Sequence, residues 1–150
     1  LLAQWTCLLK KPESDYKMFY RKLVQIMKDS DYHRTYSRDA FHRIIKPARD
    51  NNKAHIYEKG GRPVAFATWA FLSPEAENGY ITGTRKLQPE DFEGEDGQLW
   101  FIDFAAPYGH CREAIKWFRN FIRVKYGPRY SAKILRRRNH VGKLYAYGDS

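Results

Sequence analysis

The most unusual residue in this sequence is Asp103, a carboxylate within the run LWFIDFAAPYGH at positions 99–110. β-Favouring residues predict a strand there, and on a regular strand Leu99, Phe101, Asp103 and Ala105 share one face. A charged carboxylate among apolar neighbours is costly unless it is hydrogen-bonded or paired. Asp103 is therefore either a structural acid that bonds a backbone N–H or an arginine, or a member of a functional site.

His33 is the second residue with suitable chemistry. It lies in the segment SDYHR at 30–34, between two predicted helices and not on an apolar stripe. Imidazole titrates near neutral pH, so a histidine can act as a general base. The alternative is an ordinary surface histidine. The remaining histidines have no metal-ligand spacing, so the sequence predicts no metal site; they are His42, His55, His110 and His140.

Several motifs with well-understood chemistry are missing from the sequence. It contains no GxxxxGK[ST] or GxGxxG for nucleotides, and no GxSxG or Cys–His signature of a nucleophilic hydrolase. Three aromatic residues, Phe66, Trp69 and Phe71, could line a ligand channel, although such residues more often belong to the core.

The formal net charge of +10 is concentrated toward the C-terminus. Residues 112–143 contain eleven Lys or Arg and a single acid, Glu113, while the other sixteen basic and sixteen acidic residues cancel. This asymmetry predicts an acidic partner for that region, such as nucleic acid, an anionic surface or an acidic protein. The alternative is a solvated face that aids solubility.

The hydrophobic pattern predicts helices and strands that must position these residues. Helices are expected at 15–28, from an N-cap at Ser37 to Pro47, and at 110–126. Strands are expected around a Gly60-Gly61 hairpin, at 99–105, and on both sides of a turn at 139–142, whereas 73–98 is expected to be loop-rich. The order predicts one α+β domain, with a mixed sheet flanked by helices and a helix crossing between two late strands.

Length and composition limit the class of protein. A chain of 150 residues with 43% hydrophobic and 16% aromatic residues is expected to fold as a single domain. The longest apolar run is too short to cross a bilayer, and the N-terminus has no signal-peptide pattern. Two cysteines, Cys7 and Cys111, make no disulfide framework. These features predict a cytoplasmic protein without a membrane span.

Four stretches together resemble one protein family, the RTX toxin-activating lysine acyltransferases of the hemolysin-activating type. The stretches are YHR at 32–34, GRPVAFATWAFL at 61–72, GQLWFIDFAAPYG at 97–109 and HVGK at 140–143. The resemblance is closest to the activators of multifunctional RTX toxins. The resemblance implies that residues 1–150 form a single toxin-activating acyltransferase domain, with an N-terminal helical segment at 1–29 and a family-like core at 30–145.

The resemblance implies a fold, an activity and two site residues. The fold would be similar to that of GCN5-related acyltransferases (GNAT-like), with which the predicted element order is compatible. The enzyme would move a fatty acyl chain from acyl carrier protein to internal lysines of an RTX protoxin in the bacterial cytoplasm. This acylation would activate the toxin for cytolysis. The essential histidine and aspartate of the family correspond to His33 and Asp103. With an acyl substrate, Phe66, Trp69 and Phe71 become candidates for an acyl channel. No bound cofactor is implied, and a homodimer is expected.

The chemistry leaves two routes open. His33 would be the general base for the lysine amine with Asp103 as its orienting partner, or it would first accept the acyl group itself. The basic region would dock the acidic carrier protein. The docking candidates are Lys116, Arg119, Arg123, Arg136, Arg137 and Arg138.

Two other functions remain alternatives. One is a small basic nucleic-acid-binding domain in which Tyr130, Tyr145 and Tyr147 stack on bases. It accounts for the charge but not for Asp103 or the ordered motifs, so nucleic acid is the less favoured partner. The other is a coenzyme A-dependent acetyltransferase-like protein.

Overall fold

The computed structural model describes residues 14–138 and 141–147, and in these residues a five-stranded sheet forms the centre of the fold. The strands follow one another across the sheet in chain order: β1 (Ala54–Lys59), β2 (Arg62–Leu72), β3 (Gln98–Ala105), β4 (Ala132–Arg138) and β5 (Val141–Tyr147). Neighbouring strands are antiparallel except for β3 and β4, which are parallel. The mixed sheet with its helices confirms the predicted α+β class.

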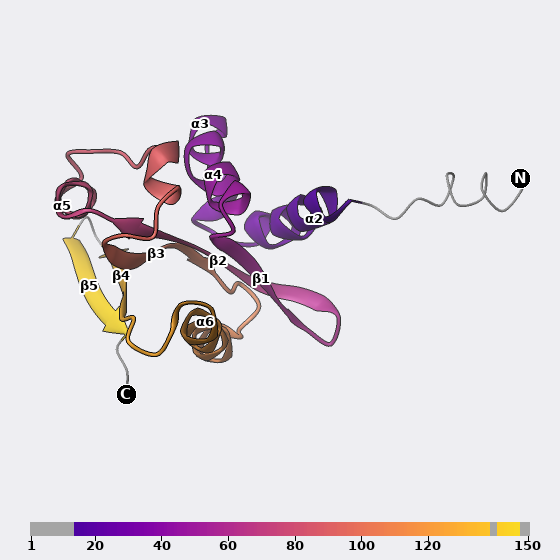
Figure 1. The fold of residues 1–150 in the computed structure, drawn as a ribbon. Helices are drawn as coiled ribbons and strands as arrows, with labels where there is room; N and C mark the ends of the chain where they lie inside the picture. Colours follow the sequence, from indigo (N-terminus) through magenta and orange to yellow (C-terminus); the bar gives the residue numbers. More distant parts are fainter. Residues whose placement is uncertain (1–13, 139–140, 148–150) are drawn as a thin grey trace, which may run out of the picture.

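Helices cover both faces of this sheet (Figure 1). The helices α2 (Asp15–Lys28), α3 (Arg38–Ala40) and α4 (Lys46–Asp50) lie on one face, and α6 (Cys111–Tyr126) lies on the other. The shorter elements are the 3₁₀ turn η1 (His33–Thr35), the π-helical segment η2 (Phe41–Ile45), α5 (Pro74–Thr82) and the 3₁₀ turn η3 (Pro89–Phe92). Among the described helices, none is both long and apolar enough to span a bilayer.

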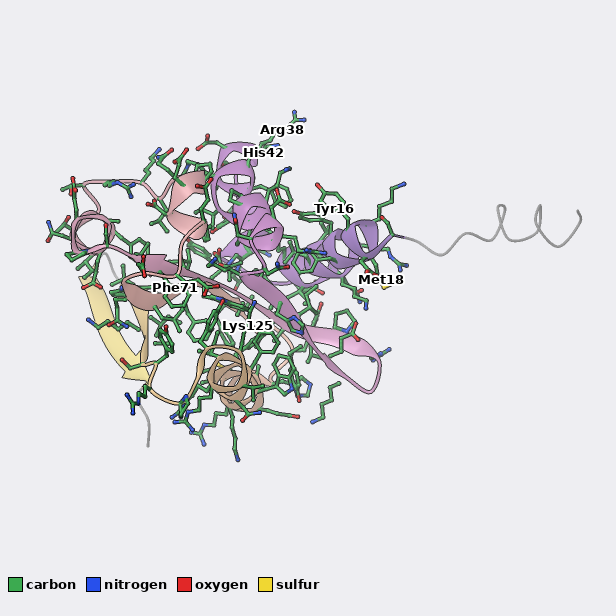
Figure 2. All side chains as sticks on the ribbon, in the orientation of Figure 1. Tyr16, Met18, Arg38, His42, Phe71 and Lys125 are labelled. Atoms are coloured by element: carbon green, nitrogen blue, oxygen red, sulfur yellow. The ribbon has the colours of Figure 1, made fainter. Side chains whose placement is uncertain are left out.

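Each face of the sheet has its own apolar layer. The α6 layer includes Ala67, Trp69, Phe71, Leu99, Phe101, Ala114, Phe118 and Ile122. Figure 2 shows Phe71 on this side, together with Lys125 of α6. The opposite layer is built from Leu23, Ile26, Ile45 and Phe66, and from Ala48, Ala70, Leu72 and Trp100. Both long amphipathic helices predicted from the sequence are therefore confirmed, each with its apolar stripe against the sheet.

The second predicted helix begins where expected but continues past its predicted end. The Ser37 hydroxyl accepts the backbone N–H of Ala40 at 3.0 Å, which confirms the N-cap. The end at Pro47 is wrong, because helical structure continues to Asp50. Pro47 lies in the first turn of α4, immediately after a π-helical segment. The altered hydrogen-bond spacing of that segment lets the helix accommodate a residue without an N–H.

The prediction that 73–98 is loop-rich is wrong for its first part, where α5 forms. The Ser73 hydroxyl accepts the N–H of Ala76 at 3.2 Å, and Pro74 occupies the first turn. Proline is favoured there because that N–H has no intrahelical partner. The two prolines that suggested loops, Pro74 and Pro89, each begin a helical element.

Both predicted hairpins are present. Gly60 and Gly61 have φ values of +58° and +77°, which glycine adopts readily, and they join β1 to β2. β4 and β5 pair from Ala132↔Tyr147 to Arg138↔Val141, so the second turn is shorter than the predicted 139–142. Positions 139 and 140 lie outside the described residues.

A β-bulge makes one prediction about β3 wrong. Thr68 pairs with Asp103, but the next residue of β2, Trp69, pairs with Phe101, so Ile102 is an extra residue in β3. Phe101 consequently packs in the α6 layer, whereas Asp103 lies on the opposite face. The four residues expected on one face are divided by the bulge, which turns Asp103 toward the N-terminal helices.

Candidate active site

The structure brings the two predicted catalytic residues together. Nε2 of His33 lies 3.1 Å from Oδ1 of Asp103, although the residues are seventy positions apart in the chain. Their exposed fractions are only 3% and 2%. His33 is therefore not a surface histidine, and the partner of the buried carboxylate is an imidazole and not an arginine.

Local structure fixes the orientation of the His33 ring. The chain leaves α2, passes Ser30 and forms the single turn η1, which begins at His33. The Ser30 hydroxyl lies 2.9 Å from Nδ1 of His33 and 3.4 Å from its backbone N. An ionised carboxylate can only accept, so Nε2–H donates to Asp103 and Nδ1 accepts from the Ser30 hydroxyl.

Asp103 receives two further side-chain donors. The Tyr36 hydroxyl donates to Oδ1 at 2.6 Å, and the Thr68 hydroxyl donates to Oδ2 at 2.9 Å. The Thr68 hydroxyl also accepts the backbone N–H of Asp103 at 3.0 Å. These bonds compensate for the loss of hydration of the buried carboxylate. Burial, followed by the Asp103 charge, raises the pKa of the Tyr36 phenol well above its usual value, so Tyr36 remains a donor.

The sequence reasoning did not identify Ser30, Tyr36 or Thr68. The spacing of Ser30 to His33, i to i+3, is the one signal that could have indicated a hydroxyl bonded within a single turn. Tyr36 and Thr68 are 67 and 35 positions from Asp103. Their roles depend on strand register and on the bulge, neither of which is visible in the sequence pattern.

The dyad lies at a cleft of about 570 Å³. β3 and β4 pair only from Leu99↔Ala132 to Phe101↔Ile134, although both strands continue further. The cleft lies where this pairing stops. β3 contributes Ile102, Asp103 and Phe104, and β4 contributes Ile134 and Leu135. Other elements contribute Tyr32, His33, Tyr36, Arg43, Ile44, Tyr80, Gly83, Arg85, Lys86, Leu87 and Ile115.

The lining of the cleft combines apolar side chains with cations. Arg43 donates to the carbonyl of Leu87 at 2.9 Å and pairs with Asp39 at 3.0 Å. Arg85 pairs with Asp91 through two bonds. A cleft of this kind suits a substrate that has both a hydrocarbon part and a polar or charged part.

The acyl-channel candidates are separated by the sheet. The ring of Phe66 lies 5.0 Å from that of His33, on the face of the N-terminal helices. Trp69 and Phe71 are buried on the other face, where Trp69 donates to the Tyr126 hydroxyl at 3.0 Å. None of the three lines the 570 Å³ cleft. Their role in an acyl channel stays a prediction.

The docking candidates lie on α6 and β4. Lys116 is exposed on α6, and Arg119 and Arg123 are half-buried there. Arg136, Arg137 and Arg138 are in β4, and their side chains lie outside the described part of the structure. A docking role for these six residues also stays a prediction.

Comparison with known proteins adds independent information. Residues 13–141 match the HlyC model, which describes the RTX toxin acyltransferase family. The leukotoxin-activating lysine-acyltransferase LktC of Pasteurella haemolytica-like sp. (strain 5943B) is 33% identical over 119 residues, covering 77% of this chain and 68% of that protein. The lysine-acyltransferase RtxC of Vibrio cholerae serotype O1 is 33% identical over 98 residues, covering 65% of this chain and 63% of that protein. The protein-lysine myristoyltransferase HlyC of Escherichia coli is 30% identical over 121 residues, covering 77% and 64%.

Proposed function

This chain belongs to the RTX toxin acyltransferase family, and we propose that it transfers a fatty acyl group from a thioester donor to lysine ε-amines of an RTX protoxin. The observation that carries the proposal is the buried His33–Asp103 pair beside a cleft lined by both apolar and cationic side chains. The names of the relatives, which are lysine acyltransferases and toxin activators, support the reaction class. The matched regions span about two-thirds of the length of these relatives.

His33 removes the proton that keeps the acceptor amine from reacting. A lysine amine has a pKa near 10.4 and is mostly protonated at neutral pH, so it must lose a proton before it attacks a carbonyl. Nε2 already carries the hydrogen that is donated to Asp103. The proton is therefore taken up at Nδ1, where the Ser30 hydroxyl either relays it or rotates away.

The acyl transfer then follows. The neutral amine attacks the thioester carbonyl, the amide C–N bond forms and the C–S bond breaks. The leaving thiolate takes a proton from the His33 imidazolium, and the remaining extra proton on the amide nitrogen passes to the freed imidazole and then to solvent. Asp103 stabilises that imidazolium while it exists. In the alternative route Nδ1 first forms the acyl bond and releases the thiol, and the lysine amine then displaces the histidine. Both routes need His33 and Asp103.

The donor we propose is acyl carrier protein in the bacterial cytoplasm. Carrier proteins of this kind are strongly acidic, and the excess positive charge of this chain lies within 112–143. Lys116, Arg119 and Arg123 present part of that charge along α6, and Arg136–Arg138 follow in β4. The acyl thioester arrives as a substrate, so the proposal includes no bound cofactor. A homodimer is part of the same proposal.

The test is intact-mass analysis of an RTX protoxin fragment after incubation with this protein and myristoyl-loaded acyl carrier protein. The wild type should add the mass of one or more acyl groups on lysine. His33→Ala and Asp103→Asn should each reduce the rate by about 100-fold or more, because general acid–base catalysis is lost. The matched control is His42→Ala. His42 is exposed and lies on the N-terminal helices away from the sheet (Figure 2), so this variant should keep the wild-type rate.

Three results would contradict the proposal. Transfer by His33→Ala at the wild-type rate would remove the histidine from the mechanism. Transfer from acyl-coenzyme A but not from the carrier protein would favour the coenzyme A-dependent reading. No transfer from carrier-bound chains of several lengths, together with tight and steeply salt-dependent binding of nucleic acid, would favour the nucleic-acid reading.

A further inference from the structure

Two hydrogen-bond donors share one oxygen of Asp103. The Tyr36 hydroxyl at 2.6 Å and Nε2 of His33 at 3.1 Å both reach Oδ1, while Thr68 occupies Oδ2. The bond from Tyr36 is the shorter of the two bonds to Oδ1. The oxygen that faces the catalytic imidazole is therefore already engaged by a second group.

The elements on both sides of Tyr36 in the chain, η1 and α3, hold it in place. Its backbone N–H bonds the carbonyl of His33 at 3.1 Å at the end of η1, and the next residue, Ser37, caps α3. Its ring lies 5.2 Å from the ring of His33 and 5.7 Å from that of Tyr32. Tyr36 also lines the 570 Å³ cleft. The phenol is thus held beside the dyad by backbone, ring contacts and its hydroxyl.

We propose that Tyr36 is a positioning residue of the acyl transfer, whose hydroxyl shares Oδ1 of Asp103 with His33 and so keeps the imidazole unprotonated and ready to act as a base at neutral pH. This inference rests on the proposed function, in which His33 is the base. It adds a third residue, 67 positions from Asp103 in the chain, that sets the pH range of the reaction.

The hydrogen bond from Tyr36 reduces the negative charge on the Asp103 oxygen that faces His33. A nearby carboxylate favours the protonated imidazolium, and the effect grows with the negative charge on the facing oxygen. A short hydrogen bond from a phenol draws electron density from that oxygen and weakens its attraction for the imidazolium. Tyr36 can do this throughout the working range because its hydroxyl stays protonated. Thr68 acts on the other oxygen and holds the plane of the carboxylate.

The remaining groups around His33 do not replace this effect. Ser30 contacts Nδ1 on the opposite side of the ring, and Phe66 of β2 packs against the ring without charge. Tyr32 contacts the ring edge at 4.9 Å between centroids. The cations that line the same cleft are Arg43, Arg85 and Lys86, of which Arg43 and Arg85 are paired with Asp39 and Asp91.

The first experiment is the pH profile of kcat/KM for Tyr36→Phe, with carrier-bound acyl donor and protoxin fragment. The variant keeps the ring and removes the hydroxyl, so Asp103 holds the imidazolium more tightly. The acid limb should move to higher pH by roughly one unit, with a plateau close to the wild-type value. The control is Tyr57→Phe. The Tyr57 hydroxyl donates to Glu113 of α6 at the same distance of 2.6 Å, so the bond that is lost has a similar length but lies away from His33. Removing this hydroxyl should leave the pH profile unchanged.

The second experiment does not depend on activity. The imidazole of His33 is titrated by NMR in the protein alone, in wild type and Tyr36→Phe, with His33→Ala identifying the signal. The proposal is supported if the pKa of His33 is higher in Tyr36→Phe than in wild type by the same amount as the acid limb of kcat/KM moves. An unchanged titration in a folded variant overturns it, even where the rate falls. If the wild type showed no acyl transfer, the proposed function would fail, and this titration would still decide whether Tyr36 acts on His33.

Discussion

The Asp103 carboxylate is the residue on which the site depends. It is 2% exposed, yet its two oxygens accept from an imidazole, a phenol and an aliphatic hydroxyl, and its own N–H is bonded to Thr68. Removing one partner of such a network leaves a buried polar group unsatisfied, which costs about 1–3 kcal/mol. Hydrogen bonds from neighbouring groups therefore offset most of the cost of burying the Asp103 charge.

Ser30 gives a prediction at the same scale. Its hydroxyl fixes the His33 ring from the Nδ1 side, so Ser30→Ala should slow acyl transfer by about ten-fold, while Ser30→Thr should retain most of the rate. Ser14 is the matched control. It makes the same kind of cap on α2, and Ser14→Ala should lower the free energy of unfolding by about 1 kcal/mol without changing the rate.

The rates are measured by the same mass assay, and the free energies by urea unfolding. Wild-type activity in Ser30→Ala would mean that the hydroxyl serves only to accept the backbone N–H of His33.

At this scale the sequence indicated two candidate catalytic residues but not their supporting groups. Asp103 drew attention because a carboxylate in an apolar strand is rare, and the resemblance to the acyltransferase family singled out His33 among the five histidines. Hydroxyl residues such as Thr68 and Tyr36 are common in every element. Their importance arises only from register, so no local pattern could have identified them.

At the scale of elements, irregularities place the site as much as regular structure does. The bulge at Ile102 determines which face of the sheet Asp103 reaches, and the single turn η1 determines how His33 meets it. The periodicity of the sequence correctly predicted α2, α6 and the strands. It could not predict the bulge, because one extra residue leaves the composition of a strand unchanged.

Tyr108 connects two of these elements. It follows β3, and its hydroxyl lies 2.7 Å from Oδ2 of Asp29 and 3.1 Å from the carbonyl of Gln25, both at the end of α2 that leads to His33. Burial, followed by the bond to Asp29, raises the pKa of Tyr108 to about 12. The folded protein therefore holds this proton more tightly than the unfolded chain, where tyrosine titrates near pH 10.

The sign of this shift gives a pH-dependent prediction. The stabilisation from Tyr108 should be complete below about pH 10 and should be lost as the pH rises through about 12. Wild type should therefore be more stable than Tyr108→Phe at pH 8, and the two should converge toward pH 12 in urea unfolding. A difference that stays constant over this range would show that the hydroxyl bond does not carry the effect.

At the scale of the whole molecule, the basic residues of α6 lie on a different face of the sheet from the His33–Asp103 pair. The dyad lies on the face of the N-terminal helices, whereas α6 and its basic residues cover the other face (Figure 1). The net excess of +10 within 112–143 creates a field that can attract an acidic protein before any close contact forms. We expect this field to affect encounter with the donor and not the chemical step.

A charge reversal at Lys116 tests whether the basic residues of α6 affect donor binding and not the chemical step. Lys116→Glu should raise KM for carrier-bound donor several-fold, leave kcat unchanged and reduce the salt dependence of kcat/KM. The control is Lys17→Glu, which makes the same charge change at an exposed position of α2 and should have little effect on KM. A fall in kcat for Lys116→Glu with KM unchanged would contradict the docking role.

The seventy positions between His33 and Asp103 also bear on how the protein is made. During synthesis α2, η1 and α4 leave the ribosome well before β3, so the histidine exists for a time without its acid, and the helices without the strands that cover them. Closing the long segment between the two residues costs conformational entropy, so we expect the His33–Asp103 pair to form only after β3 has been made. We expect a nascent chain that ends before β3 to lack this pair and to leave the apolar faces of its helices exposed to chaperones and proteases.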